Sequence, residues 1–186
     1  VWLEFRKCFA RSRGLFSDEI WDGFCRKMLK DLIEENVQYV ESRAGIGRQE
    51  IIEEVQRDHP EFGVKYIPSF GRSSSREKIA QSLDLVLDQR AVDPNRIVGI
   101  DLVEEEDKEH TNLYFINELL EARRKAEQRN ITLPLYLHSG ESNWTENENV
   151  LDAILLDARR IGHGIALFKH PLLMQIVKER GVALEV

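Results

Sequence analysis

The stretch Leu133–Trp144 places a histidine and a glutamate where an apolar strand ends. It has the sequence LPLYLHSGESNW, so His138, Gly140 and Glu141 follow directly on the apolar residues. A neutral imidazole is a common zinc ligand, and a neighbouring carboxylate can move protons to and from an activated water. Gly140 permits a tight turn that would bring Glu141 back beside His138. The pattern indicates metal-assisted hydrolysis, although a single histidine at a strand end is more often structural.

A second histidine strengthens this interpretation. His163 stands between two glycines in RIGHG, residues 160–164, one expected strand after the first motif. Glycines beside it suit close approach of a ligand or of another main chain. The other histidines, His59, His110 and His170, lie in loop or helix-start patterns and are expected to be structural or solvent-facing. His138, Glu141 and His163 are therefore the residues predicted to carry the chemistry.

Elements that alternate along the chain must position these residues. Apolar spacing indicates helices separated by short, β-branched runs, which implies parallel strand pairing. The expected helices are 18–36, 47–58, 75–90, 112–129, 148–158 and 171–180, and the expected strands are 37–44, 64–70, 96–103, 133–138, 160–164 and 182–186. The serines of residues 72–77 are expected to cap the helix that follows them.

Two architectures fit this alternation, a doubly wound sheet and a (β/α)₈ barrel. Polar residues recur at the carboxyl ends of successive expected strands, as Glu41, Asp101 and the two histidine motifs do. In a barrel all of these ends meet at one rim, where active sites lie. We therefore expect a partial (β/α)₈ TIM barrel over 1–186 as a single domain, with the first and last strands missing. The acidic run Glu104–Asp107 is expected to be a solvated face, with a pocket-lining role open for Glu104 only.

Composition limits the partners. The 186 residues carry a net charge of −7, and 42% of them are hydrophobic. An acidic surface argues against a nucleic-acid polymer or an anionic membrane as the main partner, and no apolar run is long enough for a membrane span. The two cysteines, Cys8 and Cys25, are expected to be buried free thiols. A small neutral ligand in a pocket agrees with all of these features.

Several motifs resemble one known family. HSGES resembles the His-Ala-Gly-Glu motif of the adenosine deaminases, and IGHG resembles the Gly-His-Gly motif that follows it. VGIDLV and GVALEV are similar to the strands before and after these motifs. NVQYVESRA, HPEFGVKYIPSFGRS and Trp144 are more similar to the extracellular branch, the adenosine deaminase-related growth factors.

The resemblance implies a zinc enzyme that hydrolyses adenosine or 2′-deoxyadenosine, with release of ammonia. By this resemblance His138 is a Zn²⁺ ligand, Glu141 protonates the purine ring nitrogen, and His163 orients the activated water. The residues implied to line the nucleoside pocket are Gly140, Trp144, Glu41 and Glu104. The branch implies an extracellular protein, and a homodimer formed through regions outside this chain is compatible with it.

Three departures keep alternatives open. The family's His-x-His zinc pair and its aspartate pair are absent from residues 1–186, so this segment alone is expected to be inactive. Glu104 occupies a position where the family has a glycine, which favours a catalytically inactive extracellular interaction protein as one alternative. A deaminase of AMP or adenine is the other. A nucleotide enzyme needs a basic phosphate site, for which Arg72 is the only obvious candidate.

Overall fold

The structure, a computed structural model, describes residues 2–12, 18–43, 49–142 and 146–185. Contacts divide the chain into two compact units, Val1–Val64 and Lys65–Val186. The expectation of one domain over 1–186 stays a prediction. The described residues include no helix long and apolar enough to cross a membrane.

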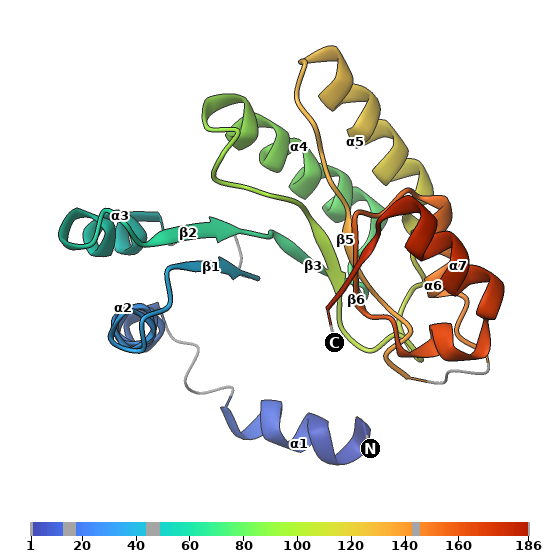
Figure 1. Cartoon of the computed structure of the whole chain (residues 1–186), viewed down its shortest axis with the longest axis horizontal. Coiled ribbons are helices and arrows are strands. Elements are labelled where there is room, and N and C mark those ends of the chain that lie inside the picture. Colours follow the sequence, from blue (N-terminus) through green and yellow to red (C-terminus); the bar gives the residue numbers. More distant parts are fainter. Residues whose placement is uncertain (1, 13–17, 44–48, 143–145, 186) are drawn as a thin grey trace. The chain divides into compact units, whose positions relative to one another are not determined.

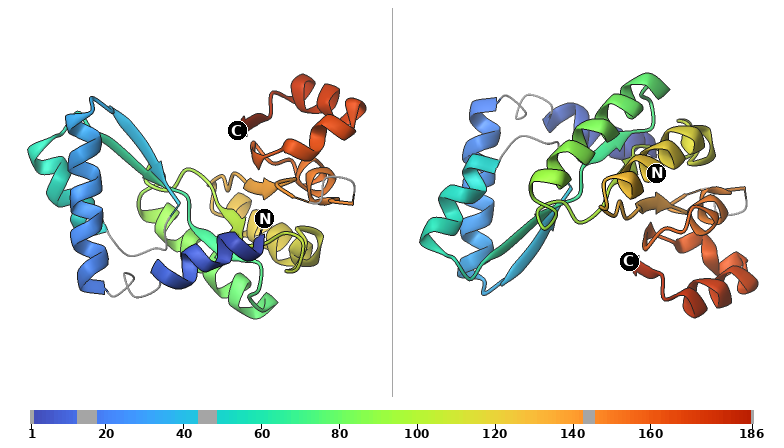
Figure 2. Two further views of the ribbon diagram at one scale, coloured as in Figure 1. Left: turned by 90° about the horizontal axis from the view of Figure 1, so that it is seen from below. Right: turned by 90° about the horizontal axis from the view of Figure 1, so that it is seen from above.

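In the N-terminal unit, two of the helices pack around a small apolar core. Its elements are α1 (Trp2–Ser12), α2 (Asp18–Glu34), β1 (Tyr39–Ser42), α3 (Gln49–Asp58) and the first half of β2 (Gly63–Tyr66), which pairs with β1. Helices α2 and α3 lie side by side in both views of Figure 2, and their core consists of Leu29, Ile51, Val55, Phe62 and Val64. Cys8 is exposed and Cys25 half-buried, so the expectation that both thiols are buried is wrong.

The C-terminal unit alternates strands and helices along the whole of its length. After β2 its elements are β3 (Ser69–Gly71), α4 (Arg76–Val92), β4 (Asp101–Val103), η2 (Leu113–Phe115), α5 (Ile116–Gln128), β5 (Tyr136–Ser139), α6 (Asn149–Leu155), β6 (Arg160–His163), η3 (Ile165–Lys169), α7 (Pro171–Arg180) and β7 (Ala183–Glu185). Each helix and strand predicted after residue 63 is present, although the strand expected over 64–70 divides into β2 and β3. Pro68, which lacks a main-chain N–H, lies at that division.

Strand order separates the two candidate architectures. β3 pairs in parallel with β4, and β5 pairs in parallel with β6, which pairs with β7. A parallel bridge between Ile100 and Leu135 joins β4 to β5, with the Tyr136 amide donating to the Ile100 carbonyl at 2.8 Å. Every strand from β3 to β7 therefore neighbours the next one in sequence. A doubly wound sheet would instead reverse its order at a switch point, so the prediction of a partial (β/α)₈ barrel is confirmed.

The helices of this unit form where the sequence supplies caps and an apolar face. Ser75 precedes α4, and its hydroxyl accepts from the Lys78 amide at 3.3 Å, as the serine-rich loop predicts. Gly181 ends α7 in the left-handed conformation that closes many helices. Apolar residues of α4 and α5 are buried against one another and the strands: Ile79, Leu83, Val86, Leu87, Leu119, Ala122 and Ala126.

Helices α4 and α5 lie side by side along one flank of this unit (Figure 1). In both views of Figure 2, α7 lies at the opposite end of the unit from α4. The strands between them run in the same direction, so their carboxyl ends face one side. His138 and His163 lie at or next to these ends of β5 and β6, Asp101 begins β4, and a barrel of this kind holds its active site on this side.

Candidate active site

His138 is oriented by a buried carboxylate on the neighbouring strand. Its Nδ1 lies 2.6 Å from Oδ2 of Asp101, and its main-chain amide donates to Oδ1 of the same residue at 2.9 Å. The Asp101 side chain is completely buried. A carboxylate bonded to one ring nitrogen leaves the other, Nε2, as the nitrogen able to bind a ligand. Histidines that bind metals usually have this arrangement.

Glu141 and His163 lie together beside His138. Nε2 of His163 is 3.6 Å from Oε1 of Glu141, and the rings of His138 and His163 meet edge to face with centroids 5.1 Å apart. The three residues predicted from sequence are thus brought together by the ends of β5 and β6. His163 has a φ of 64°, a value uncommon for a non-glycine residue. Such strain is often found at functional sites.

Gly140 makes the turn that brings Glu141 to this position. Its φ is 79°, and a Cβ added there would lie 2.4 Å from Cγ2 of Val150 and 2.9 Å from Cβ of Ala166. No other residue type fits both the conformation and the space. The predicted turn at Gly140 is confirmed, and its contact with a substrate stays a prediction.

Buried polar side chains bond the first motif at its main chain and at the Ser139 hydroxyl. The Arg72 guanidinium donates to the His138 carbonyl at 2.6 Å, and the Asn112 amide donates to the Ser139 hydroxyl at 3.0 Å. Glu106 accepts from the main-chain amides of Gly140 and Glu141. Three residues from outside the motif therefore fix it, and sequence reasoning did not find two of them, Glu106 and Asn112.

The acidic run contradicts the expectation of a solvated face. Glu105 and Glu106 are only 8% and 5% exposed. The run has no regular hydrophobic spacing, so the sequence has no periodic signal for their burial. Only the folding of the loop after β4 over the motif makes them internal.

Glu104, by contrast, is exposed. Its φ of 87° is the conformation that a glycine adopts most easily. Its carboxylate accepts from the Ser73 amide at 2.8 Å and lies against Gly71. The chain thus accommodates a side chain here without changing the left-handed main chain.

Arg72 has a structural setting that its sequence context did not reveal. The side chain is completely buried and bonds the carbonyls of His110 and His138. Burial lowers the pKa of the Arg72 guanidinium, and the nearby carboxylates of Glu106 and Asp101 oppose that effect. A cation enclosed in this way is not available to a phosphate at the rim.

Two other predicted pocket residues are not tested by the structure of this unit. Glu41 lies in β1 of the N-terminal unit, where its carboxylate accepts from the Tyr39 hydroxyl at 2.7 Å. Trp144 lies outside the described residues. Contact of either residue with a nucleoside stays a prediction.

The donor set fits a metal only in part. The bond from Asp101 to Nδ1 of His138 gives this residue the orientation of a metal ligand. Within residues 2–12, 18–43, 49–142 and 146–185, however, no group of three or more His, Cys, Asp or Glu side chains is placed to hold a metal ion. His138 therefore stays a predicted metal ligand, and the described residues do not complete a metal site around it.

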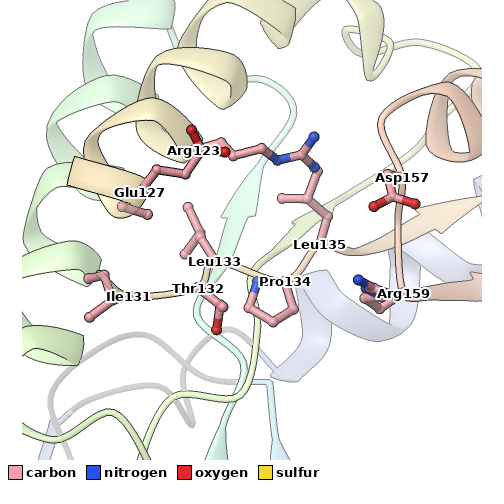
Figure 3. A pocket seen from close by; sticks show the side chains of 10 residues that line it. Arg123, Glu127, Ile131, Thr132, Leu133, Pro134, Leu135, Asp157 and Arg159 are labelled. Atoms are coloured by element: carbon pink, nitrogen blue, oxygen red, sulfur yellow. The ribbon is translucent and has the colours of Figure 1, made fainter. Parts of the chain in front are cut away.

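A separate cavity lies at the other end of β5. It has a volume of about 400 Å³ and is lined mainly by the end of α5 and by the residues that lead into β5, as Figure 3 shows. Arg123 crosses it to donate to the Leu156 carbonyl at 2.5 Å. Because it lies at the amino end of the strand, this cavity is distinct from the site around His138.

Consecutive parallel strands with polar residues at their carboxyl ends define a (β/α)₈-barrel protein, and solved structures agree. The chain is similar to an amidohydrolase with bound zinc from Burkholderia ambifaria, with a TM-score of 0.69 and 23% identity over 88% of this chain and 46% of that one. It is also similar to an adenine deaminase from Arthrobacter aurescens, with a TM-score of 0.70 and 19% identity over 95% of this chain and 54% of that one. These likenesses show the fold.

Sequence comparison gives the family. A sequence model of the family described as adenosine deaminase matches residues 20–186, and the chain belongs to this family. It is 31% identical to adenosine deaminase 2 of Dictyostelium discoideum and 30% identical to adenosine deaminase 2 of Homo sapiens, each over 100% of this chain. The chain spans 38% and 40% of the lengths of these two relatives.

Proposed function

We propose that the protein containing this chain is a zinc-dependent adenosine deaminase, which converts adenosine or 2′-deoxyadenosine and water into the inosine product and ammonia. The observation that carries the proposal is the cluster formed by Asp101 of β4 and the carboxyl ends of β5 and β6. There Asp101 orients His138, and Glu141 lies within 3.6 Å of His163. Family membership supports adenosine as the substrate.

The residues of the cluster have distinct roles. His138 would hold the metal through Nε2, because Nδ1 is bonded to Asp101. A bound zinc ion lowers the pKa of water to near neutrality. Glu141 gives a proton to the purine ring nitrogen, which makes the neighbouring carbon susceptible to attack by water. His163 hydrogen-bonds the attacking water and stabilises charge as the tetrahedral centre forms.

Two observations favour this proposal over the alternatives. Arg72, the only obvious phosphate ligand of a nucleotide enzyme, is buried under the motif. The Glu104 carboxylate is hydrogen-bonded to the Ser73 amide, which weakens the argument from Glu104 for a catalytically inactive protein. An extracellular location stays a prediction. A homodimer stays a prediction.

The test uses the full open reading frame that contains this chain. Turnover of adenosine, AMP and adenine is compared for the unchanged protein, and adenosine is expected to be the preferred substrate. Glu141→Gln should lower kcat by about 10²- to 10⁴-fold, the usual contribution of a general acid, while the zinc content is unchanged.

A matched control is Glu127→Gln, the same chemical change at the cavity beside the amino end of β5. It should leave turnover and zinc content unchanged. Full turnover by a folded, zinc-loaded Glu141→Gln protein would contradict the role of Glu141. Preference for AMP or adenine would contradict the substrate.

A further inference from the structure

Glu106 is a buried carboxylate that bonds the main-chain N–H groups on both sides of Gly140. Its Oε2 accepts from the Gly140 amide at 2.9 Å, and its Oε1 accepts from the Glu141 amide at 3.0 Å. Oε2 also accepts from the side-chain amides of Asn147 and Asn149, both at 2.9 Å. Both oxygens of one carboxylate thus hold the turn that presents Glu141.

Burial of this charge is expensive and needs compensation. A carboxylate that is 5% exposed loses its hydration, and such groups persist when they are fully hydrogen-bonded or near a cation. Four N–H donors face Glu106, and its negative charge favours the charged form of the buried Arg72 guanidinium. A buried apolar side chain in this space would leave the Gly140 and Glu141 amides without this acceptor, so the carboxylate serves to bond them.

We infer that Glu106 is a positioning residue for Glu141: its two oxygens fix consecutive main-chain amides and thereby set where the Glu141 carboxylate lies. This inference rests on the proposed role of Glu141 as proton donor. A glutamine at position 106 cannot replace the carboxylate, because its side-chain amide has one acceptor oxygen and an NH₂ group where the carboxylate has two acceptor oxygens. In Glu106→Gln the NH₂ group would face one of the two main-chain amides, and the hydrogen bond to that amide would be lost.

The experiment measures kinetics and main-chain protection in the full open reading frame. The variants are Glu106→Gln and, as matched control, Asp152→Asn, which changes a buried carboxylate that accepts from the Leu113 amide rather than from the motif. Glu106→Gln should lower kcat by about 100-fold, as for misplacement of a reacting group by about 1 Å. KM should stay within about threefold, since the substrate contacts are unchanged. Asp152→Asn should leave both constants unchanged.

A double variant separates positioning from a general structural effect. If Glu106 acts through Glu141, Glu106→Gln combined with Glu141→Gln should have the kcat of Glu141→Gln alone. Independent structural damage would instead multiply the two losses. Hydrogen–deuterium exchange of the Gly140 and Glu141 amides is followed in parallel, and Glu106→Gln should accelerate it at least about tenfold, whereas Asp152→Asn should not.

If Glu106→Gln does not fold, Glu106→Asp replaces it, because aspartate keeps the charge but is one methylene too short to reach both amides. Wild-type kcat in a folded variant, multiplicative losses, or unchanged exchange would each overturn the inference. Absence of adenosine turnover in the unchanged protein would refute the proposed function. The exchange measurement would still decide whether Glu106 holds the two amides.

Discussion

The Gly140→Ala substitution tests whether a single hydrogen atom at this position is required by the site. Gly140 has a φ of 79°, and its added Cβ would lie 2.4 Å from Cγ2 of Val150. Alanine therefore meets two separate penalties, one from its own main-chain conformation and one from its neighbours. Gly181, at the end of α7, has a φ of 65° and nothing within 4 Å of an added Cβ. Gly181→Ala consequently meets the first penalty only.

The expected magnitudes follow from these two penalties. The left-handed conformation costs a non-glycine residue about 1–2 kcal/mol. Insertion of a methyl group into a closely packed interior costs about 1–3 kcal/mol more. Gly140→Ala should therefore lower the free energy of unfolding by about 2–5 kcal/mol, and Gly181→Ala by about 1–2 kcal/mol.

Urea unfolding of both variants, followed by far-ultraviolet circular dichroism, measures this difference. A Gly140→Ala/Val150→Ala double variant supplies a second control, since it removes the side-chain atom nearest to the added Cβ. The two changes should couple favourably by about 1 kcal/mol or more, as contacting residues do. Equal losses in Gly140→Ala and Gly181→Ala, or simple additivity with Val150→Ala, would refute the reasoning.

Two further substitutions test other features of the same unit. At position 104, where φ is 87°, the Glu104→Gly variant should be more stable than the Glu104→Ala variant by about 1 kcal/mol. Both variants lose the hydrogen bond to the Ser73 amide, but only alanine keeps the strain of the left-handed main chain. Thermal unfolding of the two variants checks this order. Burial raises the pKa of Asp152, so the folded state binds the proton of this carboxyl more tightly than the unfolded state does. The free energy of unfolding should therefore increase as the pH falls from the folded-state pKa to the lower unfolded-state pKa of Asp152. Urea titrations across this pH interval measure the increase, and Asp152→Asn should abolish it.

Local patterns in the sequence were sufficient to predict the elements. Ile79, Leu83, Val86 and Leu87 recur at helical spacing, and the helix expected over 75–90 is α4, with all four residues buried. Periodicity is a local property, so it does not depend on how the chain packs. The boundaries shifted by one or two residues, as helix ends commonly do.

The central cluster was also predictable. His138, Glu141 and His163 each follow an apolar strand, and parallel strands align their carboxyl ends. The structure brings these three residues together, with the turn at Gly140 that the sequence predicts. Glu41 and Trp144 were linked to the pocket through the family resemblance, and their roles stay predictions.

Residue types, spacing and strand alternation thus determined the fold class and the residues that carry the proposed chemistry. Only the tertiary structure decided what holds them. Glu106 had the sequence context of a solvated acidic run, and Arg72 had that of a phosphate ligand, yet both are buried and bonded to the main chain of the histidine motif. The physical reason is that hydrogen bonds to main-chain amides and carbonyls are independent of the side chains being held. A sequence pattern therefore has no signal for them, and they form only when distant loops pack on the same strand end.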